Sequence, residues 1–218
     1  MTFASKPSSS ILLSPIEQEK LIEKLQVFTI QGRDKHGLAL LRVVGKFFPA
    51  RLVSVAACVK FLEEKIFPKL GDKSFSVLYV HTGVDRNQNF PGISALRSIY
   101  DAIPARIKDN LQTVYFLHPG LQSRLFLATF GRLIFTGGLY RKVKYVNRLD
   151  ILWDNVRRKE VDIPEFVYDE DQKLDHIPVM IDFGMESDHP RIYQPNYTSS
   201  SSSPFDSELR LYSLRCIA

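Results

Sequence analysis

Two histidines stand where parallel sheets often carry chemistry. His81 and His118 each close a β-prone run, at residues 75–81 and 113–117. Because the carboxyl ends of parallel strands meet at one edge of a sheet, both imidazoles are expected near that edge. Imidazole exchanges protons near neutral pH, yet the sequence ties no serine, cysteine or carboxylate to either histidine. We therefore predict that they cap the sheet, with a hydrolase that uses His81 or His118 as the alternative.

Other patterns that would indicate catalysis or metal binding are incomplete. The run Gly92-Ile93-Ser94-Ala95-Leu96 begins like a nucleophile elbow but lacks the closing glycine. Glu64 stands six residues after Cys58, where a phosphate-binding cysteine loop needs arginine. No dinucleotide fingerprint or P-loop occurs, and the histidines lie too far apart for a metal site. The sequence predicts a chain that is no enzyme, with no catalytic residues, no cofactor and no metal.

The elements that must position these residues alternate along the chain. A hairpin is expected from Val27 to Val44, with its turn at residues 32–37. Apolar positions spaced like those of a helix predict helices at 52–67, around 93–111 and at 149–158. β-prone runs lie between them, at 75–81, 113–117 and 143–146. This alternation predicts an α/β fold with a mixed, mostly parallel sheet flanked by helices.

Charge is distributed unevenly along the 218 residues. Residues 1–159 hold 25 Lys/Arg against 12 Asp/Glu, a balance of +13, and residues 160–218 hold 4 against 12, a balance of −8. A basic body suits anionic lipid headgroups or an acidic protein surface; an acidic end that folds back on a solvated basic surface is the alternative. We expect no nucleic-acid partner.

Composition indicates a globular chain in a reducing compartment. Hydrophobic residues make up 44% of the sequence, and no apolar run approaches the roughly 20 residues that span a membrane. The first ten residues lack a secretory apolar core, and the two cysteines suggest no disulfide framework. A cytoplasmic protein is expected, in contact with membranes only at their surface.

Three segments together resemble one family. They are Gly32-Arg33-Asp34-Lys35-His36-Gly37 with the apolar strand after it, then the block from Val114 to Asn147, and then Leu149 to Glu170. In order and spacing they resemble the CRAL-TRIO (Sec14-like) lipid-binding family, in the divergent branch called BCH domains. The likeness covers roughly residues 26–172. It divides the chain into a disordered lead at 1–15, a CRAL-TRIO/BCH-like domain at 16–184 and a flexible serine-rich tail at 185–218.

The resemblance implies a hydrophobic pocket between the sheet and a mobile gate helix. The gate would be Leu121 to Phe135, which is apolar on nearly all sides; a cavity beneath it or simple burial in the core explains that equally well. Strand positions on one alternating face would line the pocket, either Phe75, Val77 and Tyr79 or Leu78 and Val80. The expected pocket and gate residues are Leu125, Phe126, Phe130, Leu133, Ile134, Val77 and Tyr79. The expected headgroup or membrane contacts are Arg141, Lys142, Lys144 and Arg148.

The function implied by this likeness is non-catalytic. We expect a module that binds or exchanges a phospholipid or phosphoinositide at anionic, cytosolic membrane surfaces. The alternative is a BCH-type interaction scaffold that binds small Rho-family GTPases or their regulators, or associates with itself.

Overall fold

The computed structural model describes residues 13–134 and 138–175, which form a five-stranded sheet in the order of the sequence. The first two strands are antiparallel and the following ones are parallel. The strands are β1 (Phe28–Arg33), β2 (Ala39–Val44), β3 (Phe75–Val80), β4 (Leu111–Leu117) and β5 (Val143–Val146). The predicted α/β class with a mixed, mostly parallel sheet is confirmed. Almost all of the predicted lead, and the predicted tail, lie outside the described residues.

The hairpin that opens the sheet is closed by a buried carboxylate. The side chain of Asp34 accepts hydrogen bonds from the backbone N–H groups of His36 and Leu38, each at 2.9 Å. Its second oxygen accepts from the hydroxyl of Ser76 on β3, at 2.8 Å. An aspartate that binds backbone groups two and four residues ahead stabilises a turn, and here it also joins that turn to the neighbouring parallel strand.

Helices follow nearly every strand. They are α1 (Pro15–Lys24), α2 (Val55–Phe61), η2 (Leu62–Ile66), α3 (Phe67–Leu70), α4 (Ile93–Ala102), α5 (Ala105–Asn110), α6 (Leu121–Ile134), α7 (Leu139–Lys142), α8 (Leu149–Asn155) and α9 (Glu165–Asp175). A short 3-10 turn, η3 (Arg158–Glu160), precedes α9. Within the described ranges, none of these helices combines the length and the apolar character that crossing a bilayer requires.

The helix after β2 begins and ends three residues later than the predicted range 52–67, at Val55 and Leu70. Pro68 and Gly71 were expected to mark its end; the helix passes Pro68 after the π-helical turn η2 and ends at Leu70, directly before Gly71. In that turn the N–H of Phe67 bonds to the carbonyl of Leu62, five residues earlier. The wider turn changes the hydrogen-bond register just before a residue that has no N–H to donate.

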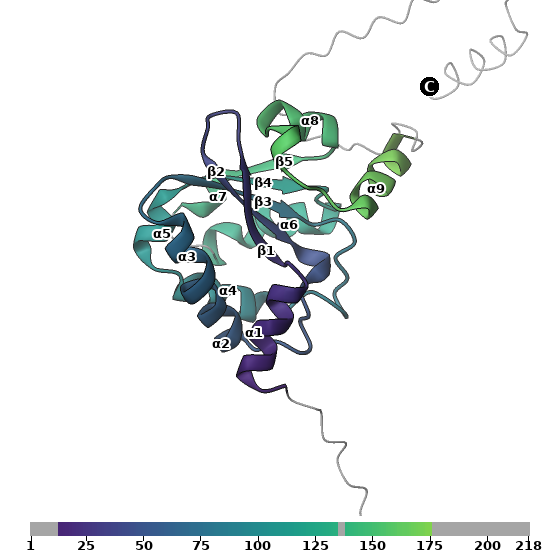
Figure 1. Ribbon diagram of the computed structural model, residues 1–218. Coiled ribbons are helices and arrows are strands. Elements are labelled where there is room, and N and C mark those ends of the chain that lie inside the picture. Colours follow the sequence, from purple (N-terminus) through teal and green to yellow (C-terminus); the bar gives the residue numbers. More distant parts are fainter. Residues whose placement is uncertain (1–12, 135–137, 176–218) are drawn as a thin grey trace, which may run out of the picture. The chain divides into compact units, whose positions relative to one another are not determined.

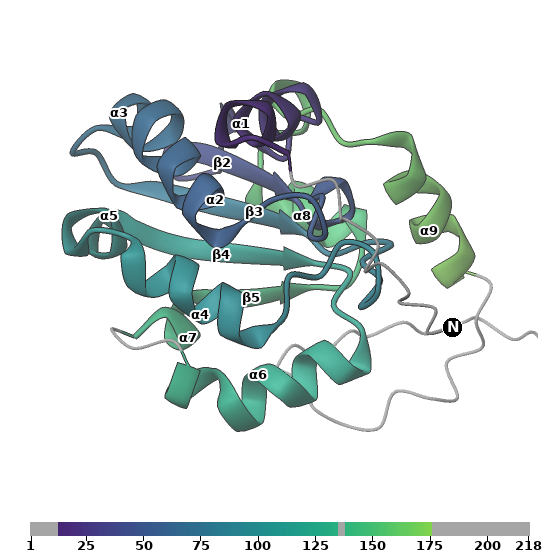
Figure 2. The same ribbon diagram turned by 90° about the horizontal axis from the view of Figure 1, so that it is seen from below.

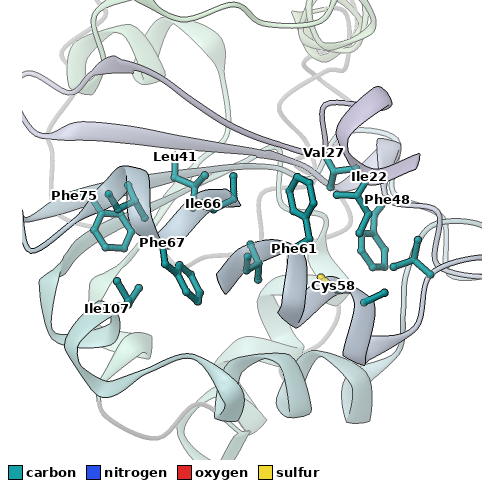
Figure 3. Packing of buried hydrophobic residues seen from close by; sticks show 14 residues of the cluster. Ile22, Val27, Leu41, Phe48, Cys58, Phe61, Ile66, Phe67, Phe75 and Ile107 are labelled. Carbon is teal, nitrogen blue, oxygen red and sulfur yellow. The ribbon is translucent and has the colours of Figure 1, made fainter. Parts of the chain in front are cut away.

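Strand order decides where the helices lie. Each parallel crossover steps to the next strand in the same direction, and right-handed crossovers of that kind put their helices on one face. Figures 1 and 2 show α2 to α7 on that face, which we call the crossover face. Its core joins Phe61 and Phe67 to strand residues Leu41 and Phe75, all buried (Figure 3). Cys58 lies in the same cluster, and burial raises the pKa of its thiol to about 12.

The opposite face is covered by the later part of the chain. A second core joins Leu40, Leu78 and Leu117 of the sheet to Leu152 of α8 and Val167 of α9. The buried guanidinium of Arg42 reaches across β1 and donates to the carbonyl oxygen of Asp162 at 2.6 Å. The carboxylate of Asp162 lies 3.4 Å from the same nitrogen. Arg42 thereby fixes the segment that leads from α8 to α9.

Candidate lipid-binding site

A cavity of about 630 Å³ lies on the crossover face, beneath α6. Its floor is formed by β3, β4 and the start of β5, and its walls by α4, α6, α7 and the segment that follows β3. Figure 2 shows α6 running along this side of the sheet, with α7 beside its end. The lining residues are Tyr79, His81, Val84, Arg86, Phe90, Ile93, Leu96, Val114, Phe116, Gln122, Ser123, Leu125, Phe126, Leu127, Leu139, Tyr140 and Val143.

Alternation along the strands makes the floor of the cavity aromatic. Successive side chains point to opposite faces of a sheet, so Tyr79, Phe116 and Tyr145 fall on the crossover face of three neighbouring strands. Tyr79 and Phe116 line the cavity, and Tyr145 contacts Phe116 from outside its wall. The ring centroids of Tyr79 and Phe116 lie 5.1 Å apart, and those of Phe116 and Tyr145 lie 6.0 Å apart. Burial raises the pKa of Tyr79 to about 12, so its hydroxyl stays protonated. The floor therefore offers aromatic surface and carries no charge from this phenol.

Helix α6 covers the cavity without being buried itself. Leu121, Leu125 and Phe130 are 71%, 59% and 48% exposed. Near its end, Gly131 lies against α7, where a Cβ would come within 2.8 Å of the Tyr140 ring. The helix is thus apolar toward the cavity and toward solvent. That double character explains why its sequence shows no clear polar face.

The polar groups of the cavity gather where the parallel strands end. The Oγ atom of Ser123 lies 2.8 Å from Nε2 of His81, and the hydroxyl of Tyr79 lies 3.4 Å from Nδ1 of the same ring. Burial lowers the pKa of His81, so its imidazole is neutral at pH 7. A neutral imidazole accepts one hydrogen bond and donates another, which this pair of hydroxyls satisfies. The side chains of Gln122 and Arg86 line the cavity at the same end.

His118 belongs to a separate cluster outside the cavity. Its Nδ1 lies 2.9 Å from Oγ1 of Thr82, and its Nε2 lies 3.1 Å from Oδ1 of Asp171 on α9. The same carboxylate oxygen accepts from the N–H of Leu149 at 2.8 Å and from Nε of Arg148 at 3.2 Å. Burial lowers the pKa of His118 more strongly than Asp171 raises it. Thr82 is only 3% exposed and absent from the cavity wall, so this hydroxyl, imidazole and carboxylate join α9 and α8 to the sheet.

The predicted pocket residues fall into four groups. Tyr79, Leu125 and Phe126 line the cavity. Val77 instead packs against the core beneath α2 and α3, although its register partner Val114 on β4 lines the cavity, so the covering helix decides its environment. Phe130 does not line the cavity, and its ring contacts that of Phe126 with centroids 5.6 Å apart. The side chains of Leu133 and Ile134 lie outside the described residues.

The four predicted headgroup residues do not form one patch. Arg141 is exposed on α7, and Lys142 beside it donates to the carbonyl oxygen of Lys108 at 3.1 Å. Lys144 lies on the opposite face of the sheet, since it pairs in register with buried Tyr115. Arg148 binds Asp171 at 3.2 Å in the cluster around His118. Arg141 and Lys142 belong to α7, Lys144 to β5, and Arg148 to the start of α8, so residues close together in the sequence lie on three elements that face different ways.

Sequence reasoning missed several cavity residues. The pairing of Ser123 with His81 joins positions 42 residues apart, and no local spacing indicates such a contact. Ile93 and Leu96 of α4 belong to the apolar pattern that predicted a helix around 93–111, and they were not among the expected pocket residues. Gly92 is the N-cap of α4 and has a φ of +89°. The helix that forms this wall of the cavity therefore begins directly after a glycine. Among the described residues, no group of three or more His, Cys, Asp or Glu side chains is placed to hold a metal ion.

Comparison with known proteins gives a consistent family. Residues 37–173 match the model of the divergent CRAL/TRIO domain. The chain is 28% identical over 155 residues to ganglioside-induced differentiation-associated protein 2 of Xenopus tropicalis. It is 28% identical over 156 residues to the Danio rerio protein of that name, and 26% over 155 residues to the Homo sapiens protein.

These similarities cover 70% of this chain and 30% of each of the three relatives. The chain thus corresponds to less than a third of the length of the proteins it matches. The family match spans more than half of the chain, and the sheet, the covering helix and the apolar cavity agree with the predicted CRAL-TRIO-like architecture. The chain therefore belongs to the divergent CRAL/TRIO domain family.

Proposed function

We propose that this chain binds a membrane lipid in the cavity beneath α6 and exchanges it at a membrane surface without chemical conversion. The observation that carries this proposal is the cavity of about 630 Å³ with its mainly apolar and aromatic lining. Pockets of several hundred Å³ with few polar groups are typical of small-molecule ligands. Phospholipids or phosphoinositides are the ligand class that the sequence resemblance suggests.

The attachment of α6 supports its role as a gate. At its start, Ser123 bonds to His81 and the guanidinium of Arg124 bonds to the side chain of Asn147. Near the end of α6, Gly131 packs against the ring of Tyr140, which itself lines the cavity. The two side-chain hydrogen bonds of Ser123 and Arg124 are weak restraints for a 14-residue helix with exposed leucines. A helix so held can move away from the sheet and open the cavity.

The exposed side of α6 supports membrane contact. Leu121, Leu125 and Phe130 present apolar groups to solvent, and Arg141 lies exposed on the neighbouring α7. Apolar groups beside a basic group suit the boundary between acyl chains and anionic headgroups. We infer that α6 meets the membrane when lipid enters or leaves.

The polar end of the cavity favours binding over catalysis. The one hydroxyl–imidazole pair in the cavity wall, Ser123 with His81, has the Tyr79 hydroxyl on the far side of the ring. In serine hydrolases a carboxylate usually occupies that position and stabilises the imidazolium. Because burial also lowers the pKa of His81, the site disfavours the charged imidazole that such catalysis forms.

The experiment that tests lipid binding is native mass spectrometry of the purified chain after incubation with mixed liposomes. We expect a bound lipid at one per chain, and its loss in Phe126→Asp, which places a charge in the cavity wall. Ile16→Asp is the matched control, because Ile16 is exposed on α1 and outside the cavity. Circular dichroism establishes that both variants fold. A folded Phe126→Asp protein that loads lipid normally would contradict the proposal, as would a wild-type chain that remains lipid-free.

A protein-binding scaffold is the second candidate, favoured by the position of β5. Among the described strands, β5 is the last in the sheet and pairs only with β4. An open edge strand can accept an added strand from a partner or a second copy. Concentration-dependent association in analytical ultracentrifugation, abolished by Tyr145→Pro on β5, is expected for this candidate. Association that persists in Tyr145→Pro would exclude the β5 edge as the binding surface.

A further inference from the structure

We propose that the ligand is a lipid with a single hydrocarbon chain and an anionic head, with the head held at the carboxyl edge of the sheet. This inference rests on the proposed lipid-binding function and narrows its ligand. Three features carry it: the size of the cavity, the separation of its polar and apolar ends, and the side chain of Arg86.

Cavity size limits the number of chains. A methylene group occupies about as much space as a water molecule, for which roughly 30 Å³ is the usual share. The volume of about 630 Å³ therefore holds one long hydrocarbon chain with its head. A phospholipid with two long chains has more than twice as many heavy atoms and exceeds this volume. The volume matches one chain more closely than two, and we infer a ligand with a single chain.

The lining divides the cavity into two chemically different ends. Val114, Leu139 and Val143 lie at the end near the start of β5 and the end of α6, where the wall is apolar apart from the phenol of Tyr140. His81, Gln122 and Ser123 stand at the other end, where β3 finishes and α6 begins. A chain that lies along the cavity would place its methyl end toward β5 and its head toward His81.

The polar end carries a cation that the fold does not use. Arg86 is exposed and lines the cavity where it opens to solvent, and it forms no hydrogen bond or ion pair with any described residue. Gln122, at the exposed start of α6, likewise lines the cavity and donates to no described acceptor. His81 is neutral and already bonded to Ser123, which leaves Arg86 as the charged group in the cavity wall. A guanidinium binds carboxylate and phosphate groups with two parallel hydrogen bonds, so an anionic head suits this end.

The test compares four lipids that carry the same oleoyl or oleyl chain. Oleate has one chain and a carboxylate, oleoyl lysophosphatidic acid has one chain and a phosphate, and oleyl alcohol has one chain and no charge. Dioleoyl phosphatidic acid has two chains and a phosphate. Native mass spectrometry measures stoichiometry on the full chain, and titration calorimetry of single-chain lipids below micelle-forming concentrations measures Kd.

We expect one molecule of at least one anionic single-chain lipid per chain, weaker binding of oleyl alcohol, and no loading of dioleoyl phosphatidic acid. The better of oleate and lysophosphatidic acid identifies the head as carboxylate or phosphate. Arg86→Gln is expected to weaken the anionic lipids about fivefold, the upper range for an exposed ion pair, and to leave the alcohol unchanged. Arg97→Gln is the matched control, since Arg97 pairs with Asp101 on the surface of α4 and does not line the cavity.

The outcomes separate this inference from the function on which it rests. Loading of dioleoyl phosphatidic acid as readily as the single-chain lipids would overturn the one-chain ligand and leave lipid binding intact. Equal binding of oleyl alcohol and oleate, with no effect of Arg86→Gln, would overturn the anionic head. Failure of all four lipids, and of mixed liposomes, would overturn the proposed function itself.

Discussion

The two halves of the crossover face are each covered by a helix that links two parallel strands. The two helices differ in how tightly they pack against the sheet. Over β2 and β3, the helix formed by α2, η2 and α3 buries Phe61, Phe67 and Ile66 against the strands. Over β4 and β5, α6 leaves a cavity of about 630 Å³ and exposes Leu121 and Leu125. Both helices link parallel strands of one sheet, so topology alone does not create the cavity. The difference lies in how closely each helix approaches the strands below it.

The strongest test of this difference in packing removes one aromatic ring from each half. Phe61→Ala is expected to lower the free energy of unfolding by about 3–5 kcal/mol, because it leaves a hole in a packed core. Phe126→Ala is expected to cost about 1 kcal/mol, because its ring already borders empty space. Urea denaturation measures both. Equal losses would show that the α6 half is packed as closely as the other.

Adding volume tests the same difference in the opposite direction. Ala57→Leu in buried α2 is expected to destabilise the chain by about 1–3 kcal/mol through overpacking. Val114→Phe on the cavity floor is expected to change stability by less than about 1 kcal/mol, since the ring has room. It is also expected to reduce lipid loading by occupying the space of the chain. A Val114→Phe protein that is strongly destabilised would argue against an open cavity at this position.

The two histidines are expected to make the free energy of unfolding depend on pH. Burial lowers the pKa of both His81 and His118 from 6.5 in the folded state. The unfolded state therefore binds more protons as pH falls through about 6.5, and the free energy of unfolding falls with it. We expect a smaller loss of stability between pH 7.5 and pH 5 in His81→Gln and in His118→Gln than in the wild type.

Chemical denaturation at the two pH values measures this effect, and a surface variant, His36→Gln, serves as the control. Unchanged pH dependence in both buried-site variants would contradict the assigned environments. A change in His81→Gln that disappears when lipid is bound would place the titration in the cavity half of the molecule.

The smallest expected effect is at the contact between α6 and α7. Alanine favours a helix over glycine by about 1 kcal/mol, but a Cβ at Gly131 would meet Tyr140 Cδ2 at 2.8 Å. Since Tyr140 lines the cavity, its ring has room to shift. We expect Gly131→Ala to change stability by no more than about 1 kcal/mol and to reduce the cavity. Thermal unfolding with lipid loading measures both, and Ala128→Gly on the exposed side of α6 is the control.

Much of the fold was predictable because it depends on local patterns. The hairpin around Asp34 and the strands at β3, β4 and β5 have the alternation and turn residues that such elements require. The extension of the helix past Pro68 was not predictable, since it depends on a π-helical turn within a packed helix. The predicted helix at 149–158 ends at Asn155 instead, because Val156 forms a bridge with Asp34 of the hairpin. Helix α9 is held by Asp171 through partners on other elements, and no local pattern indicated its start.

The candidate site was predictable only in its general position. Leu125, Phe126 and Tyr79 come from segments that the family resemblance associates with a pocket, and they line the cavity. Val77 and Phe130 come from the same segments but lie beyond it. Val77 and Tyr79 lie two residues apart on one face of a strand, and Phe126 and Phe130 lie one turn apart on a helix. The sequence pattern therefore does not distinguish the members of either pair. Whether they meet a cavity, a core or solvent depends on which other element covers them.

By itself, the sequence determined the alternation of strands and helices, the two-sided apolar character of α6 and the family to which the chain belongs. These properties follow from side-chain type and spacing, which act within one element. Only the tertiary structure decided that α6 stands off the sheet, that Ser123 meets His81, and that Arg86 faces the cavity without a described partner. Each of these depends on contacts between residues far apart in the chain, where packing of whole elements sets the distances.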